Sequence, residues 1–556
     1  MIWPVFAKSL TPWLTGAGAR SAEGTDIGHE DAEGMAYVGV RVEPTVRLGS
    51  VVQGGSMTDT LMCMPGNTAT HLFHPFSWEK KSHEVVYLLH NAILINGFYE
   101  IFTMLIRFSI ENFKCFRDRA ELSMVASPFS QHPQHVIAMP SKLQGDGLLK
   151  LAAIYGANAS GKTKLVEGLR SLRSIVVNSR QPGKRLPVEP FRLASDSRTA
   201  SVRFDIEFST EGKTFQYGLV SSADGRSIEE EWLYQLSGGR ESKCFERKTV
   251  GDDAVVEIGA GFAKKGSSEL EKLKLVSEAT QINQSYLAKA WENKSAVADR
   301  VVRWFRDSLT IIGAESDYEA LELQAAKDDN FSNFLGDYLS AAGTGISQIL
   351  SEGIEIDFEK RFKNFDATKK DEILRNLDEG DGVVLVSSVG SLSKVAKNKS
   401  GELVEYKLKA GHKSDSGDTV YFDFNSESHG TQRLTHLLPA LYDASKAQRV
   451  YIIDELDRKL HPLLTKKFVN DFVSSSLTQA SQLVFTTHDT NLLDQECIRR
   501  DEVWFVEKDC SNGAAALYPL TDFDVRSDLR VDKGYLNGRF GAIPFFAGCN
   551  LPQGDR

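Results

Sequence analysis

One short stretch near residue 150 constrains the fold of this chain more than any other. Residues 151–163 read LAAIYGANASGKT, an apolar run that leads into the pattern G-x-x-x-x-G-K-[ST]. The apolar run predicts a buried strand, and the following KLVEGLRSL predicts a helix. The glycines allow the backbone to curl so that several N–H groups face phosphate oxygens, and the dipole of the following helix favours the same anion. The combination of strand, loop and helix therefore predicts a phosphate-binding loop in an α/β fold.

The side chains of this loop suit a nucleotide and a metal ion. Lys162 supplies a positive charge for the β- and γ-phosphates, and Thr163 offers its hydroxyl to Mg²⁺. We therefore expect ATP and Mg²⁺ as ligands. The residues expected to hold the nucleotide on this basis are Gly156, Ser160, Gly161, Lys162 and Thr163.

A second segment, RVYIIDELD, lies almost 300 residues later. Its apolar run from Val450 to Ile453 predicts a buried strand that ends at Asp454 and Glu455. Such a strand delivers Asp454 to the metal ion and Glu455 to the place where water attacks the γ-phosphate. An ordinary core strand ending in a charged turn has the same pattern, but the phosphate-binding loop upstream favours the catalytic interpretation.

A third segment, LVFTTHDTNLLD, places a histidine at the end of a predicted strand. At the same edge of the sheet as the phosphate-binding loop, His488 can reach the γ-phosphate and the attacking water. A lone histidine is more often structural, and the order of the motifs argues for a role in the site. We therefore predict Lys162, Glu455 and His488 as catalytic residues, and Thr163 and Asp454 as metal ligands.

A fourth segment, ESHGTQRL, lies just ahead of a predicted helix that leads into the Asp454 strand. Ser428 and Gly430 form a Ser-x-Gly turn that predicts a second phosphate-binding site at a helix N-terminus. An ordinary Ser/Gly helix cap is the alternative. The position of the segment between the other motifs favours phosphate binding.

The order GANASGKT, ESHGTQRL, VYIIDE, TTHD resembles the ABC-type ATPases of the RecF, SMC and OLD branch. The segment LIRFSIENFKCF is similar to the first strands of that branch, and Asn158 also fits its phosphate-binding loop. The resemblance covers most of residues 104–546. It implies an α/β ABC-type core with a mixed sheet and flanking helices. The strand-like alternation of residues 201–237 predicts an inserted antiparallel β lobe, and the helical spacing of residues 267–312 predicts a helical subdomain.

The resemblance also implies a homodimer in which two ATP molecules are sandwiched head to tail. Ser428 and Gly430 would then contact the γ-phosphate bound to the other protomer. The chain departs from the family in reading ESHG in place of L-S-G-G, and in carrying His461-Pro462 after Leu460, as OLD-like chains do. Gln181 and Gln216 are both candidates for the Q-loop glutamine.

The chain divides by pattern into five parts. Residues 1–103 hold only six of the 65 Lys and Arg residues and show no sustained period, so we predict a leader that is disordered or not native, with a small accessory domain as the alternative. The remaining parts are residues 104–200 with the phosphate-binding loop, 201–263 as the β lobe, 264–420 as a helical and mixed insertion, and 421–556 as the rest of the ATPase core.

Composition limits the partners and the compartment. With a net charge of −10, the protein can bind nucleic acid only through a local basic patch. The lysines between residues 389 and 413 are a candidate for such a patch, and an ordinary solvated surface is the alternative. The apolar run 85–108 carries too many polar residues for a membrane span. Six scattered cysteines without metal-ligand spacing indicate free thiols and predict a cytoplasmic protein.

The C-terminal segment from Leu517 resembles bacterial AAA-family ATP-binding proteins of abortive-infection and phage-defence systems, a group that includes the ATPase subunit of PARIS. The resemblance implies an ATP-driven sensor or scaffold that controls an effector in another chain, such as a nuclease. Asp522 and Asp524 lack the glutamate that a nuclease site of their own would need. A RecF-like DNA-repair ATPase and a non-hydrolysing ATP-dependent scaffold stay open as alternatives.

Overall fold

The computed structural model describes residues 36–42, 46–53, 56–60, 76–77, 102–137, 147–178, 183–315, 318, 321–355, 382–386, 392–397, 403–476, 480–494, 496–525 and 530–544. Contacts divide the chain into two compact units, Met1–Leu88 and Leu89–Arg556.

In the first unit, four strands form an antiparallel sheet of order β1-β2-β3-β4. The sequence pattern did not predict these strands. They are β1 (Ala36–Val42), β2 (Val46–Gln53), β3 (Ser56–Thr60) and β4 (Phe76–Ser77). Residues 1–35 lie outside the described residues, and the leader hypothesis for residues 1–103 stays a prediction.

The second unit is built on a six-stranded sheet of order β15-β21-β22-β9-β23-β24. The first five strands in this order are parallel, and β24 is antiparallel to β23. All residues of β9 and β21 are buried, which explains why their sequences are apolar throughout. The strands are β9 (Leu151–Tyr155), β15 (Leu309–Ile312), β21 (Val450–Ile453), β22 (Gln482–Thr486), β23 (Val503–Lys508) and β24 (Ala515–Pro519).

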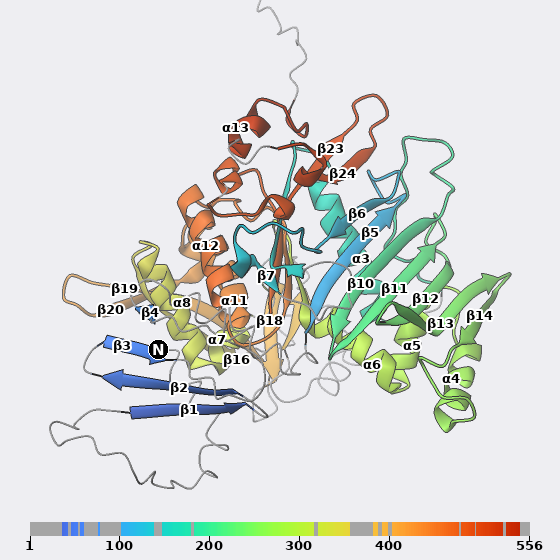
Figure 1. Cartoon of the computed structure of the whole chain (residues 1–556), viewed down its shortest axis with the longest axis horizontal. Coiled ribbons are helices and arrows are strands. Elements are labelled where there is room, and N and C mark those ends of the chain that lie inside the picture. The colour runs from blue at the N-terminus through green and yellow to red at the C-terminus, as the bar shows by residue number, and fades with distance from the viewer. Residues whose placement is uncertain are drawn as a thin grey trace, which may run out of the picture. The chain divides into compact units, whose positions relative to one another are not determined.

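Alternate residues of these parallel strands pack into two separate cores. In β9, Ala152 and Ile154 join the core that contains α3 (Lys162–Val177) and an antiparallel sheet, whereas Leu151 and Tyr155 join the core of the opposite face. That opposite face is covered by α11 (His429–Ala444) and α12 (Pro462–Ser475), as Figure 1 shows. The sheet is therefore sandwiched, and its strand ends are the places where polar groups can reach solvent.

The antiparallel sheet has seven strands in the order β14-β13-β12-β11-β10-β5-β6. Short helices pack on it, and a π-helical turn, η3, ends at β15. The strands are β5 (Met104–Glu111), β6 (Ala120–Ser123), β10 (Val202–Thr210), β11 (Lys213–Ser221), β12 (Ile228–Ser237), β13 (Arg240–Val250) and β14 (Asp253–Ile258). The helices are α4 (Ser268–Glu278), α5 (Tyr286–Glu292), α6 (Ala296–Arg303) and η3 (Trp304–Ser308).

A third sheet has the order β16-β19-β18-β17, and β20 pairs with β19 beside β18. Helices α7 (Leu321–Lys327) and α8 (Asp329–Ala341) pack on β16. The strands are β16 (Ile346–Glu355), β17 (Gly382–Val386), β18 (Leu392–Lys397), β19 (Leu403–Lys413) and β20 (Thr419–Asp423). Lys399 lies outside the described residues, and a DNA or partner contact of the lysines in this region stays a prediction.

Short elements complete the second unit. They are β7 (Val136–Ile137), β8 (Leu148–Leu149), α13 (Val531–Leu536) and the 3-10 turns η2 (Pro133–His135), η4 (Phe424–Ser426), η5 (Thr490–Leu493), η6 (Arg500–Glu502) and η7 (Leu520–Asp522). The predicted α/β fold class, with flanking helices and an antiparallel lobe, is confirmed.

Candidate nucleotide site

The three catalytic segments meet at one edge of the parallel sheet. The loop 156–163 follows β9, Asp454 follows β21, and His488 follows β22 closely. Because β22 pairs with both β21 and β9, these three carboxyl ends are neighbours in space. The carboxyl edge of a parallel sheet is where ligands bind in α/β proteins.

The loop after β9 has no room for larger residues at its two glycines. A Cβ atom at Gly156 would lie 2.4 Å from the carbonyl oxygen of Val506, and one at Gly161 would lie 2.8 Å from the sulfur of Cys115. Gly161 has φ +125 and Ala159 has φ +62, conformations that glycine adopts far more readily than other residues. The loop therefore curls tightly over the start of α3.

Two side chains of the loop indicate that its ligand is an anion. Lys162 Nζ donates to two backbone carbonyl oxygens, of Gly156 at 2.8 Å and of Ala157 at 3.2 Å, and to no side chain among the described residues. The hydroxyl of Ser160 is buried and, within the described part of the chain, has no hydrogen-bond partner. A buried polar atom without a partner is costly, and phosphate oxygens would satisfy it. The residues present thus fit a nucleotide phosphate.

The charge of Lys162 is sensitive to its surroundings. Burial lowers the pKa of the Lys162 ammonium to about 8, and the nearby carboxylates of Asp454, Glu455 and Asp457 oppose that shift. The tertiary structure thus brings these carboxylates within electrostatic range of the loop lysine.

Asp454 and Glu455 are held by one hydroxyl from the next strand. Thr486 Oγ1 donates to Asp454 Oδ1 at 2.7 Å and accepts from the backbone N–H of Glu455, also at 2.7 Å. Glu455 has φ +49, a conformation that turns the chain sharply after β21. Its carboxylate is paired with Arg458 at 3.0 Å. Thr486 therefore orients the carboxylate of Asp454 and holds the backbone of Glu455.

His488 lies at the exposed edge of the sheet. Its backbone N–H donates to Asp457 Oδ2 at 3.2 Å. Desolvation by the surrounding protein, with the positive charge of Lys162 second, lowers the pKa of the His488 imidazole. The lowered pKa favours the neutral form of the ring, which can donate or accept a hydrogen bond.

The segment ESHG begins helix α11. Ser428 is the N-cap, and its hydroxyl accepts from the backbone N–H of Thr431 at 3.1 Å. A Cβ atom at Gly430 would lie 2.7 Å from the carbonyl oxygen of Lys459. The ordinary helix cap that the sequence left as an alternative is present, and it leaves Ser428 exposed at the helix end.

Arg433 joins this helix to the end of β21. Its guanidinium is buried and donates to the backbone carbonyl oxygens of Asp454 at 2.9 Å, Gly313 at 3.0 Å and Glu455 at 3.3 Å. The start of α11 and the acidic turn are therefore tied together by one side chain.

The turn ENFKCF lies against the phosphate-binding loop. Asn112 donates from its buried amide to the carbonyl oxygens of Ser197 and Ala200 at 2.9 and 2.8 Å. Lys114 forms an ion pair with Glu167 of α3, and Cys115 faces Gly161. This turn thus braces the loop and the helix that follows it.

Residues 151–494, more than half of the chain, match the protein family described as "AAA domain, putative AbiEii toxin, Type IV TA system". The chain belongs to this AAA-domain family. No curated protein matches it. Among solved structures, the SMC head domain from Thermotoga maritima is similar over 75% of this chain and 98% of that chain, with 12% identity and a TM-score of 0.30. An SMC head bound to the C-winged helix domain of ScpA is similar over 74% and 96%, with 13% identity and a TM-score of 0.31.

The family, together with the phosphate-binding loop at the sheet edge, identifies an ATP-binding protein of the ABC-type P-loop ATPase class. In the described part of this AAA-domain protein, no helix is long and apolar enough to cross a membrane. No group of three or more His, Cys, Asp or Glu side chains in the described residues could hold a metal ion by itself.

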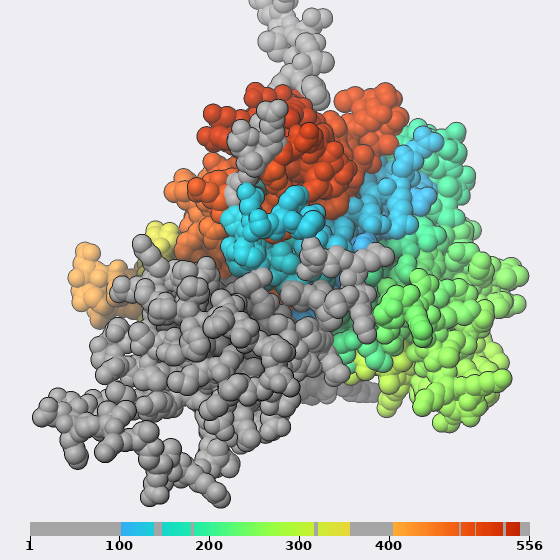
Figure 2. All heavy atoms as spheres, viewed as in Figure 1, coloured from blue at the N-terminus to red at the C-terminus, as the bar shows by residue number. Residues whose placement is uncertain are grey.

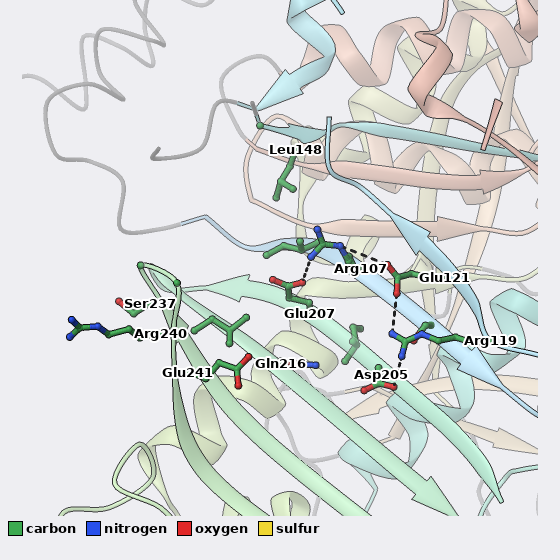
Figure 3. A pocket seen from close by; sticks show the side chains of 17 residues that line it. Arg107, Arg119, Glu121, Leu148, Asp205, Glu207, Gln216, Ser237, Arg240 and Glu241 are labelled. Atoms are coloured by element: carbon green, nitrogen blue, oxygen red, sulfur yellow. Dashed lines mark hydrogen bonds and ion pairs between the residues drawn. The ribbon is translucent and has the colours of Figure 1, made fainter. Parts of the chain in front are cut away.

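Two glutamines were candidates for the Q-loop of the AAA-domain protein. Gln181 lies outside the described residues. Gln216 lies on β11 and lines a groove of about 470 Å³ on the antiparallel sheet, beside ion pairs such as Arg107–Glu207 at 2.6 Å (Figure 3). The Q-loop assignment therefore stays open.

Three residues of this site were not singled out from the sequence. Thr486, Asp457 and Arg433 each act on a group from a different strand or helix. The segments that contain these residues were recognised as motifs. The sequence does not indicate which group of another strand or helix their side chains contact.

Proposed function

We propose that this AAA-domain protein hydrolyses ATP by in-line attack of water on the γ-phosphate. The observation that carries the proposal is the meeting of the phosphate-binding loop, Asp454 with Glu455, and His488 at the ends of adjacent strands. Phosphoryl transfer depends mainly on positioning and on charge stabilisation, which such an edge provides.

The loop side of the site binds the phosphates. Gly156, Asn158, Ser160 and Gly161 form the cradle, and Lys162 stabilises the negative charge that develops during transfer. Thr163 and Asp454 would hold Mg²⁺, which when bound neutralises phosphate charge. Thr486 keeps the Asp454 carboxylate in one orientation for that task.

The opposite side of the site acts on water. Glu455 orients and polarises the attacking water, and His488 steadies the γ-phosphate through its neutral ring. Arg458 pairs with Glu455, which favours one orientation of the carboxylate beside the sheet edge. His488 follows β22, which pairs with the loop strand β9, whereas Glu455 and Arg458 lie in the turn after β21, on the far side of β22.

Ser428 and Gly430 complete the site of a second copy. Both are at the start of α11, where backbone N–H groups and the helix dipole favour an anion. Ser428 is exposed, as a residue that contacts another protomer must be. The working form is therefore a homodimer or higher oligomer that sandwiches ATP between copies.

The biological role we propose is that of a sensor or scaffold in anti-phage defence, which controls an effector supplied by another chain in the cytoplasm. The family description names the AbiEii toxin of a type IV toxin–antitoxin system. The resemblance of the C-terminal segment to abortive-infection ATPases, including the PARIS subunit, supports an effector in trans. DNA stays open as a further partner.

The catalytic assignment is tested by ATPase assays with Mg²⁺. We expect Glu455→Gln to lower turnover by at least about 100-fold while ATP still binds. Glu315→Gln is the matched control, because Glu315 also pairs with Arg458 and is not one of the proposed catalytic residues. Hydrolysis by Glu455→Gln at the original rate would show that the assignment is wrong, and no turnover by the unaltered protein would favour the non-hydrolysing scaffold.

The role in defence is tested by affinity purification from the native host with ATP and Mg²⁺. A stoichiometric protein enriched with Glu455→Gln over the unaltered chain supports effector control and identifies the effector. Recovery of DNA alone, with affinity that falls steeply with salt, would favour a RecF-like repair ATPase instead.

A further inference from the structure

Strand β20 exposes three large apolar side chains in succession. Val420, Tyr421 and Phe422 are 45%, 44% and 49% exposed. Successive residues of a strand point to opposite faces, so both faces of β20 are apolar and open to solvent. Exposed apolar patches of this kind mark interaction surfaces.

One edge of β20 is also open. Its residues 419–423 pair with 409–413 of β19, and no other described strand pairs with β20. The β19–β20 hairpin reaches the surface at the left of the view in Figures 1 and 2. An open strand edge that carries apolar side chains is a place where natural proteins bind another chain.

The face that carries Tyr421 extends across Gly411 and Lys409 of β19 to β16. The ring of Tyr421 lies over Gly411, where a Cβ atom would be 3.1 Å from Cε1, and its hydroxyl donates to Gln348 at 2.7 Å. Leu350 and Ile354 follow Gln348 on the same face and are 47% and 39% exposed.

The other face of β20 leads to the start of α11. The ring of Phe422 contacts His412 at 5.6 Å between centroids, and His412 Nε2 lies 2.8 Å from Glu427 Oε1. Glu427 directly precedes Ser428, so β20 is held in position next to the residue that caps α11.

A further apolar residue lies on another segment that packs on this helix end. Lys459 contacts the start of α11 at Gly430, and Leu463, at the start of α12, is 71% exposed. Exposed apolar side chains therefore occur in two segments that each contact the start of α11, β20 through His412 and Glu427, and the Leu463 segment through Lys459 four residues earlier.

We infer that this surface, defined by Val420, Tyr421, Phe422, Ser428 and Leu463, is the docking surface for a second copy of the chain. The inference rests on the proposed function, in which Ser428 acts on the nucleotide of another copy. A copy that brings its phosphates to Ser428 must cover the neighbouring segments, and their apolar side chains then add contact area to the dimer. Strand β20 thus makes dimerisation depend on the inserted sheet as well as on the nucleotide.

The test measures dimerisation of Glu455→Gln with ATP and Mg²⁺ by analytical ultracentrifugation. Adding Phe422→Asp, or in a second variant Tyr421→Lys, is expected to raise the dimer dissociation constant at least about tenfold. Monomer affinity for ATP should not change. Leu275→Asp is the matched control, because Leu275 is 67% exposed on α4 and lies outside the docking surface.

The outcomes separate this inference from the proposed function. Dimers that form equally well with both β20 variants would overturn the docking surface and leave the ATP sandwich intact. Loss of another bound protein with unchanged dimers would assign β20 to that protein and also overturn the inference. If Glu455→Gln stays monomeric with ATP, the proposed dimer itself fails, and the docking surface fails with it.

Discussion

The guanidinium of Arg433 donates a hydrogen bond of 2.9 Å to the backbone carbonyl of Asp454. Arg433 lies on α11, which Ser428 caps, whereas Asp454 directly follows β21. This hydrogen bond links the first turns of α11 directly to the acidic turn that follows β21. In the proposed dimer, this contact couples the docking of a second copy to the position of Glu455.

Replacement of Arg433 tests this coupling. We expect Arg433→Ala to lower ATP turnover at least about tenfold and to cost about 2–4 kcal/mol of stability, since it leaves buried carbonyl groups without donors. Arg433→Lys keeps the charge and cannot reach three carbonyls, so its turnover should also fall. Lys446→Ala, a change at an exposed ion pair just beyond the same helix, should change stability by less than about 0.5 kcal/mol. ATPase assays measure the turnover, and thermal unfolding measures the stability. An Arg433→Ala protein with normal turnover would contradict the coupling between α11 and the acidic turn.

Thr486→Val should lower turnover by about 10–100-fold, because it removes the hydroxyl that orients Asp454 and satisfies the Glu455 N–H. Thr486→Ser keeps the hydroxyl and should restore most of the activity. The half-saturating Mg²⁺ concentration should rise for the valine variant alone. If both variants behave alike in this titration, Thr486 has only a packing role.

The affinity for ATP should fall at alkaline pH. The pKa of Lys162 is about 8 in the structure, and bound phosphates favour its charged form. Above that pKa, binding must take up a proton, so affinity falls by roughly 20-fold between about pH 7.5 and about pH 9.5. Titration of a fluorescent ATP analogue at each pH measures the affinity. Lys162→Arg stays charged over the whole range and should lose this pH dependence, and an equally steep fall in that variant would assign the effect to another group.

The β lobe should depend on a buried acidic residue. Glu231 accepts hydrogen bonds from Tyr217, Ser285 and the backbone N–H groups that begin α5, and Arg247 lies 3.9 Å away. Glu231→Gln should destabilise the protein by about 3–5 kcal/mol, since Arg247 would keep a buried charge without its partner.

The matched control for this change is Glu230→Gln. Glu230 is the neighbouring residue on β12, and its side chain is 41% exposed and pairs with Lys248. The Glu230→Gln variant should shift the midpoint temperature of thermal unfolding only slightly, because exposed ion pairs contribute little to stability. Equal shifts for the two variants would refute a special role for Glu231.

The amino-acid sequence by itself determined the local pieces of the site. The run before Gly156 is apolar because β9 is covered on both faces, and Gly156 and Gly161 occupy positions without room for a side chain. Ser428 caps α11 by a hydrogen bond within a few residues. The Ser428 cap and the φ of +125 at Gly161 are local features, so a pattern of residues is enough to predict them, and the roles assigned to these residues stay predictions.

Only the tertiary structure decided which of these pieces meet. The position of β22 between β21 and β9 brings Thr486 to Asp454, and the packing of α11 brings Arg433 to the same turn. The exposure of β20 likewise follows from the order of the strands in its sheet. Strand order arises from the packing of segments hundreds of residues apart, and local periodicity carries no information about it.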